Sequence, residues 1–98
     1  MNHRVKVKNM ALIRLTPQER LAFGQRMRAA RELAGLSMTK VADETGVAIN
    51  AVTQWEKTGA TPGIALRPVL AELYGVEEDL LFREYAAHMA ANRKLLSA

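Results

Sequence analysis

SMTKVADETGVAINAVTQWE, residues 37–56, is the stretch that decides the fold. Two short segments with apolar residues at helical spacing flank Gly46 in its middle. Ser37 can cap the first segment, and Gly46 can adopt the left-handed conformation in which helices often end. Val52 and Trp55 share one face of the second segment, so we expect that face to pack inward. The stretch therefore predicts two short helices joined by a tight turn.

A longer helix is predicted before this stretch. Thr16 can cap it, Pro17 suits its first position, and Glu19 can complete a capping box. Gly35 ends the pattern, because glycine readily takes the conformation that closes a helix. The apolar stripe of this helix consists of Phe23, Met27, Ala30 and Ala34.

Two more helices are predicted after it, and the fold class is therefore all-α. The first begins near Arg67 or opens with a distorted turn, because Pro68 deep inside a helix would remove a hydrogen bond and clash with the preceding turn. The second runs from about residue 77 to residue 96, with acidic residues at its start and basic residues near its end. That order complements the helix dipole at both ends.

Composition limits the classes of protein to which the chain can belong. Its 98 residues, 49% hydrophobic and 24% charged, fit one small globular domain. The absence of cysteine excludes disulfides, a thiolate nucleophile and a cysteine-based zinc site. The chain has no apolar run of the roughly 20 residues that span a bilayer, and no secretory signal is visible. We therefore expect a cytoplasmic protein with no membrane partner.

The net charge of +4 is unevenly distributed. Residues 1–31 carry eight basic residues against Glu19 alone, whereas residues 32–79 carry three basic residues against eight acidic ones. A basic third of this kind fits a polyanionic partner, although a solubilising surface explains it equally well. The acidic middle of the chain confines any contact with nucleic acid to a local region.

The region around residues 37–56 resembles the helix-turn-helix proteins of the phage Cro and repressor type, the XRE family. The resemblance runs from Phe23 to Leu81 and keeps its spacing over five elements, with Pro62, Gly75-Val76 and residues 79–81 at the matching places. It implies a five-helix, repressor-like domain over residues 16–81. A short basic arm over residues 1–15 precedes this domain, and a C-terminal helical extension over residues 82–98 follows it.

The resemblance also implies which residues meet DNA. In this family the second helix of the motif enters the major groove and its early residues read base edges. Asparagine and glutamine can bond adenine through two hydrogen bonds, and the methyl groups of isoleucine and threonine can pack on that of thymine. Carried over residue by residue, the base-reading residues are Ile49, Asn50, Thr53 and Gln54.

Other matching positions hold the DNA backbone or the fold itself. Residues at the start of the first motif helix would bind phosphate through a hydroxyl and backbone N–H groups. The phosphate-binding residues are then Ser37, Met38, Thr39 and Lys57. Arg31 and Glu56 match positions that form an internal ion pair, which is architectural.

Three residues depart from the family pattern. Met38 replaces a glutamine that binds phosphate, which leaves only a backbone donor there. Thr45 replaces an apolar core residue before the turn. Ala48 cannot cap the second motif helix with its side chain, at a cost of about 1 kcal/mol relative to serine. These departures predict modest affinity for each subunit.

The C-terminal extension admits two interpretations. Its apolar stripe either folds back over its own domain or forms the seam of a homodimer, which would compensate for the weak binding of a single motif. The residues of the candidate seam are Phe82, Tyr85, Met89 and Leu96, with Ala86 in the same stripe.

The resulting hypothesis is a sequence-specific transcriptional regulator, a dimeric repressor that reads a palindromic operator in double-stranded DNA through the major groove. The alternative is an antitoxin or adaptor that binds a protein partner through the C-terminal helix. No nucleophile, base and orienting group converge in the pattern, so we expect no enzyme. His3 and His88 are isolated in the sequence, so we expect neither a metal nor another cofactor.

Overall fold

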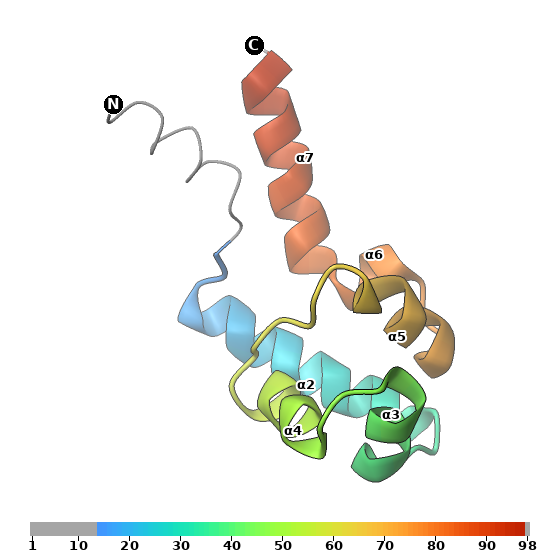
Figure 1. Cartoon of the computed structure of the whole chain (residues 1–98). Helices are drawn as coiled ribbons and strands as arrows, with labels where there is room; N and C mark the ends of the chain where they lie inside the picture. The colour runs from blue at the N-terminus through green and yellow to red at the C-terminus, as the bar shows by residue number, and fades with distance from the viewer. Residues whose placement is uncertain (1–13, 98) are drawn as a thin grey trace, which may run out of the picture.

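The structure is a computed structural model that describes the backbone of residues 14–97 and the side chains of residues 14–95. Within these residues it is all-helical, which confirms the predicted fold class. The basic positions Arg4, Lys6 and Lys8 of the expected arm lie outside the described residues. The helices (Figure 1) are α2 (Pro17–Leu33), α3 (Met38–Thr45), α4 (Ile49–Lys57), α5 (Leu66–Tyr74), α6 (Glu78–Leu81) and α7 (Arg83–Ser97).

The helix boundaries follow the local chemistry that the sequence predicts. At the start of α2, the Thr16 hydroxyl accepts from the Glu19 N–H at 3.1 Å, and a Glu19 carboxylate oxygen accepts from the Thr16 N–H at 2.8 Å. This is the expected capping box. Gly46 ends α3 with φ of 74°, a left-handed conformation that only glycine adopts at little cost.

The start of α5 shows how the chain accommodates Pro68. The helix begins at Leu66, so Pro68 occupies its third position. The first turn of a helix lacks intrahelical acceptors for its N–H groups, and a residue without an N–H loses nothing there. The predicted start near Arg67 is therefore confirmed.

The predicted continuous helix from residue 77 to residue 96 is wrong. The chain breaks at Phe82, where φ is −112° and ψ is 41°, and α6 and α7 are separate helices. At the break Tyr85 N–H bonds to the Phe82 carbonyl, which leaves the Leu81 carbonyl without its intrahelical donor. Arg26 supplies the missing donor through Nη1 at 3.2 Å. Arg26 on α2 thus stabilises the break between α6 and α7 with a hydrogen bond from outside these two helices.

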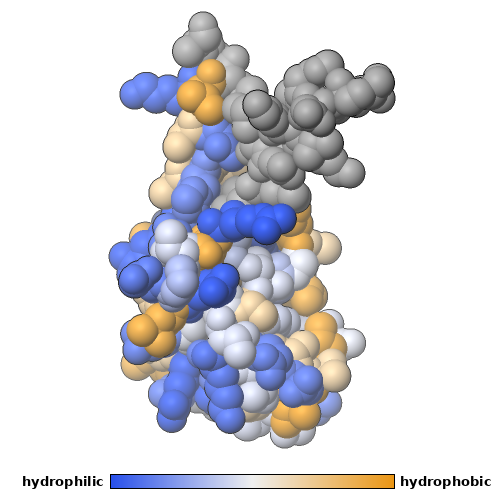
Figure 2. Space-filling view, turned by 90° about the vertical axis from the view of Figure 1, so that its left-hand side faces the viewer, coloured by the Kyte–Doolittle hydropathy of each residue, from blue (hydrophilic) through white to orange (hydrophobic). Residues whose placement is uncertain are grey.

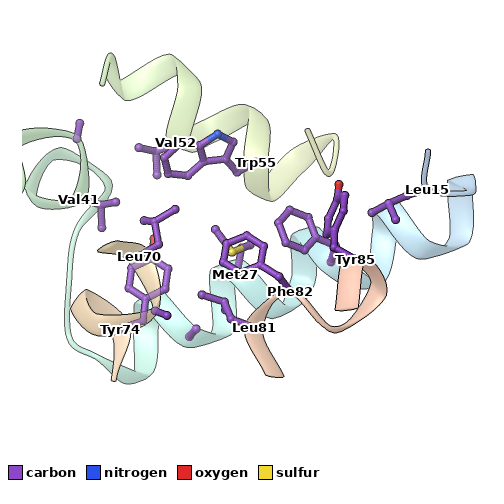
Figure 3. Close-up of a cluster of buried hydrophobic side chains, with 14 residues drawn as sticks. Leu15, Met27, Val41, Val52, Trp55, Leu70, Tyr74, Leu81, Phe82 and Tyr85 are labelled. Carbon is purple, nitrogen blue, oxygen red and sulfur yellow. The ribbon is translucent and has the colours of Figure 1, made fainter. Parts of the chain in front are cut away.

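The core gathers one buried face from each of the helices α2 to α6 and the first turn of α7 (Figure 3). Phe23 and Met27 of α2 are completely buried, and so are Val52 of α4 and Leu70 of α5. The Phe23 ring packs against two aromatic rings of the C-terminal segment, with centroids 5.6 Å from Phe82 and 5.9 Å from Tyr85. Leu15, which we assigned to the basic arm, also belongs to this core.

Helix α7 is anchored at its first two turns and then projects from the body of the domain (Figure 1). Glu84 pairs with Arg26 through two hydrogen bonds of 2.8 and 2.7 Å. Burial disfavours the charged form of Glu84, but the hydrogen bonds from Arg26, a backbone hydrogen bond and the nearby positive charges of Arg26 and Arg83 together lower the pKa of the carboxyl. One turn later, His88 Nε2 lies 3.1 Å from a Glu19 carboxylate oxygen. These contacts fix the direction of α7 relative to α2.

Helices α2 and α4 approach each other closely at Gly24. A Cβ atom added at Gly24 would lie 2.4 Å from the backbone carbonyl oxygen of Glu56, far inside van der Waals contact. Backbone cannot yield as a flexible side chain does, so α4 can lie this close to α2 only because residue 24 is glycine.

We predict that Gly24→Ala lowers the free energy of unfolding by about 1–3 kcal/mol, because it forces α4 away from α2. Gly63→Ala is the matched control, since an added Cβ there meets nothing within 4 Å. Urea unfolding followed by helical circular dichroism measures both. Equal stability of Gly24→Ala and the parent chain would contradict the close crossing.

Candidate nucleic-acid interface

The stretch from Ser37 to Glu56 folds into two helices that pack on each other, with α4 also lying across α2 (Figure 1). The inward face of α4 carries Val52 and Trp55, which are 0% and 4% exposed and point into the core (Figure 3). The opposite face of α4 lies at the surface, where Ile49, Asn50 and Lys57 are exposed. The predicted base-reading residues belong to that opposite face or to its edges.

The structure brings the four predicted base-reading residues together on the first two turns of α4. Asn50 is exposed and Ile49 is 49% exposed, so both can reach a ligand. Thr53 and Gln54 are half-buried at the edges of the face. The Thr53 hydroxyl donates to the Ile49 carbonyl at 3.2 Å, which leaves its oxygen able to accept a hydrogen bond.

The N-terminus of α3 carries the predicted phosphate-binding groups. The Ser37 hydroxyl accepts from the Lys40 N–H at 3.1 Å, so its own hydrogen remains available to donate. The N–H groups of Met38 and Thr39 occupy the first positions of α3, where the helix offers no acceptor. The helix dipole adds a partial positive charge at the same place.

Two of the three departures from the family pattern have a structural explanation. The Met38 side chain is half-buried and packs against the core, with its sulfur 3.5 Å from the Thr53 hydroxyl oxygen, so it joins α3 to α4. The Thr45 hydroxyl donates to the Val41 carbonyl at 2.7 Å, which satisfies a polar group that replaces an apolar one. The Ala48 side chain offers no hydrogen bond to the N–H groups in the first turn of α4.

Sequence reasoning missed one exposed cation at this surface. Lys40 lies one turn after Ser37 on α3, and its ammonium is 3.0 Å from the Glu44 carboxylate. Both side chains are about half exposed, so the pair is weak and solvent-screened. The spacing of three residues between Ser37 and Lys40 is the sequence signal that could have placed Lys40 near the phosphate-binding end of α3.

An ion pair joins the C-terminal ends of α2 and α4. Arg31 Nε and Nη2 bond the two carboxylate oxygens of Glu56 at 2.7 and 3.0 Å, and Arg31 Nη1 bonds the Leu36 carbonyl at 2.9 Å. The side chains of Arg31 and Glu56 are only 11% and 3% exposed. Hydrogen bonds to Glu56 raise the pKa of Arg31, against the opposing effect of burial. Nearby, burial raises the pKa of Tyr74 to about 12.

The structure corrects the candidate dimer seam. Phe82 and Tyr85 are 2% and 4% exposed and belong to the intramolecular core, so neither is available to a second chain. Tyr85 also contacts Thr61 through their hydroxyl groups. Met89 is 48% exposed on α7, whereas the side chain of Leu96 lies outside the described residues.

Among residues 14–97, no three His, Asp or Glu side chains come together in a way that could hold a metal ion. His88 instead pairs with Glu19, and His3 lies outside the described part. None of the described helices is both long enough and apolar enough to span a bilayer.

Comparison with protein families decides the classification. A family model described as a helix-turn-helix domain matches residues 22–82, more than half of the chain. The chain belongs to the Cro/repressor (XRE) type of helix-turn-helix family. The match covers most of α2 and all of α3 to α6, and it ends at the break before α7. No curated protein and no solved structure matches the chain.

The helix-turn-helix domain indicates a DNA-binding regulator, and the earlier resemblance is confirmed. In this family the second helix of the motif enters the major groove, and here that helix is α4.

We predict that Glu56→Gln lowers the free energy of unfolding by about 3 kcal/mol, because it leaves the charge of Arg31 buried without its counter-charge. Glu44→Gln is the control, since the exposed Lys40–Glu44 pair contributes less than about 0.5 kcal/mol. Urea unfolding distinguishes the two variants. A loss for Glu56→Gln no larger than that of the control would refute the role of the ion pair.

Proposed function

We propose that the chain is a sequence-specific transcriptional regulator, a dimeric repressor that places α4 in the major groove of a palindromic operator. The observation that carries this proposal is the division of α4 into two faces. One face is buried against α2 and α3, and the other presents Ile49 and Asn50 to solvent. A helix held rigidly from behind can position side chains against base edges without a further cost in ordering its backbone.

Each base-reading residue has a chemical role in the proposal. Asn50 and Gln54 donate and accept hydrogen bonds, which allows each to bond adenine through two contacts. Ile49 and Thr53 offer methyl groups to thymine. The proposed site therefore favours sequences rich in A·T pairs at the positions that α4 faces.

The phosphate contacts position the domain on the duplex. One phosphate lies at the positive N-terminal end of α3 in this proposal. It accepts hydrogen bonds from the Ser37 hydroxyl and from the N–H groups of Met38 and Thr39. Lys57, exposed at the end of α4, holds another phosphate. We add Lys40 to the proposed phosphate-binding residues, because its ammonium can leave the Glu44 carboxylate and bind a phosphate instead.

A dimer supplies the affinity that one small domain lacks. Two copies related by a two-fold axis would place their recognition helices about 34 Å apart, which requires an operator with two-fold symmetry. Residues 16–81 form the DNA-binding unit in this proposal, and α7 is the element that extends beyond it. The basic arm before residue 15 adds further attraction to phosphate, and the protein acts in the cytoplasm, where it meets DNA.

Selection of bound duplexes from a random pool at physiological salt tests the proposal. We expect enrichment of a site with two-fold symmetry. Recovery of unenriched DNA that is lost on adding moderate salt would leave only backbone attraction. In that case the antitoxin or adaptor function is favoured, because α7 projects from the domain with Met89 and Leu95 exposed.

On the selected operator, Asn50→Ala and Gln54→Ala should each lose about 1–3 kcal/mol of discrimination at particular base pairs. The loss arises because alanine cannot form the paired hydrogen bonds. Gln18→Ala, an exposed glutamine in the first turn of α2, is the control. Fluorescence anisotropy with single-base operator variants measures the effect, and unchanged discrimination in both variants would show that these residues are not readers.

Lys57→Ala should weaken binding to all DNA sequences alike and should reduce the slope of log K against log salt by about 1, because one phosphate contact is lost. Arg83→Ala on α7 serves as a control with the same change in charge. Binding measured over a series of salt concentrations separates them. A sequence-dependent loss in Lys57→Ala would contradict the phosphate assignment.

A further inference from the structure

Most arginines of α2 are paired with a carboxylate of the same chain. Arg26 and Arg31 are largely buried, and each lies 2.7 Å from a carboxylate oxygen. Arg28 lies on the surface, 3.3 Å from a carboxylate one turn further along α2. Arg20 is different, because its side chain is exposed and forms no ion pair with another residue in the described part of the chain. The basic charge of α2 is therefore available to an outside partner mainly at Arg20.

Within the described residues, the Arg20 guanidinium makes a single weak hydrogen bond. Its Nη1 donates to the Leu15 carbonyl at 3.4 Å, which is longer than a typical N–H···O bond. A carbonyl is neutral, so this contact leaves the positive charge of Arg20 uncompensated. A guanidinium carries several N–H donors in a planar fork that matches the oxygens of a phosphate. Arg20 can therefore bind a phosphate group without breaking an ion pair.

The loop that follows α4 passes directly over Arg20. A Cβ atom added at Gly59 would lie 2.6 Å from the Arg20 Cβ, so the two segments of backbone are in close contact. Gly59 also has φ of 70°, a left-handed conformation that favours glycine. This approach places Arg20 beside the chain that leaves α4, at a residue only two positions after Lys57.

Hydrogen bonds hold this loop in a defined position. The Gln54 carbonyl accepts from the Thr58 N–H at 3.0 Å, from the Thr58 hydroxyl at 2.8 Å and from the Ala60 N–H at 3.4 Å. Lys57 precedes these residues at the end of α4, where its side chain is exposed and has no ion pair among the described residues. The loop therefore holds an unpaired cation of α4 near the unpaired cation of α2.

Arg20 continues the side of α2 on which α4 lies. Helical spacing places positions 20, 24 and 31 on one side of α2. At the other two positions, Gly24 approaches the backbone of Glu56, and Arg31 pairs with its carboxylate. Figure 2 views the molecule from the side at which α2 begins, and hydrophilic side chains cover much of that face. Arg20 therefore lies at the edge of the surface that includes α4.

A phosphate contact at Arg20 is separate from the one proposed at the start of α3. The start of α3 packs beside the middle of α4, because the Met38 sulfur lies 3.5 Å from the Thr53 hydroxyl oxygen. Arg20 instead lies beyond the end of α4, beside Gly59. Two phosphate contacts at separate points along α4 fix the angle of this helix in the groove, whereas one contact leaves that angle free.

We propose that Arg20 binds a phosphate of the DNA backbone beside the end of α4, near the phosphate held by Lys57, and that this contact fixes the angle of α4 in the major groove. The inference rests on the proposed function for the identity of the polyanion. Arg20 precedes residues 22–82, which the family model matches, so the family pattern does not assign this contact.

The salt dependence of DNA binding tests the contact in the full-length chain. Arg20→Ala should weaken binding to the selected operator and to an unrelated duplex by the same factor, and should reduce the slope of log K against log salt by about 1. Arg20→Lys should keep the slope of the parent chain, because it keeps the charge. The double variant Arg20→Ala/Lys57→Ala should reduce the slope by about 2, since two phosphates each lose a contact. Arg83→Ala, in the first turn of α7, removes the same charge elsewhere and should leave the slope unchanged.

Fluorescence anisotropy over a series of salt concentrations measures the slopes, under conditions where circular dichroism shows each variant to be folded. The proposal is overturned if Arg20→Ala keeps the slope of the parent chain, if Arg20→Lys loses it as the alanine variant does, or if Arg83→Ala lowers it equally. A parent chain that prefers its operator, with an unchanged slope in Arg20→Ala, rejects this contact alone. A parent chain without sequence preference, whose slope still falls in Arg20→Ala, rejects the proposed function alone. A parent chain that binds no DNA overturns both.

Discussion

The structure depends on the close crossing of α2 and α4. Gly24 removes the side chain that would collide with the backbone of Glu56, and Trp55 fills the space beside the crossing. The ion pair between Arg31 and Glu56 then closes the far end, because both charges are nearly buried and can be satisfied only by each other and the Leu36 carbonyl. A crossing fixed by backbone contact, packing and charge leaves α4 one orientation.

That orientation determines what the outer face of α4 can do. With Val52 and Trp55 held in the core, Ile49 and Asn50 are displayed on a rigid helix, and the N-terminus of α3 opens beside them with free N–H groups. The combination suits a polyanion whose groove accepts a helix and whose phosphates accept N–H donors. The positive charge that DNA requires is local here, which agrees with a chain whose residues 32–79 are acidic overall.

Local chemistry made much of this fold predictable, whereas contacts between distant residues did not. The capping box at Thr16, the turn at Gly46 and the start of α5 around Pro68 each depend on neighbours within a few residues. The break at Phe82 depends instead on Arg26, which is 55 residues from the Leu81 carbonyl that it binds. Nothing in the periodicity of residues 77–96 marks that distant donor, so the pattern predicts one long helix. For the same reason the spacing of Phe82 and Tyr85 could not distinguish an internal core from an external seam.

The central claim is that α4 and the start of α3 form the surface that meets DNA. Nuclear magnetic resonance titration of the labelled chain with its selected duplex tests it directly, through the change in each backbone amide signal. The account predicts the largest changes at residues 37–40 and 49–57, with small changes over α5. Changes centred on α5 or α7, with the signals of α4 unmoved, would contradict it.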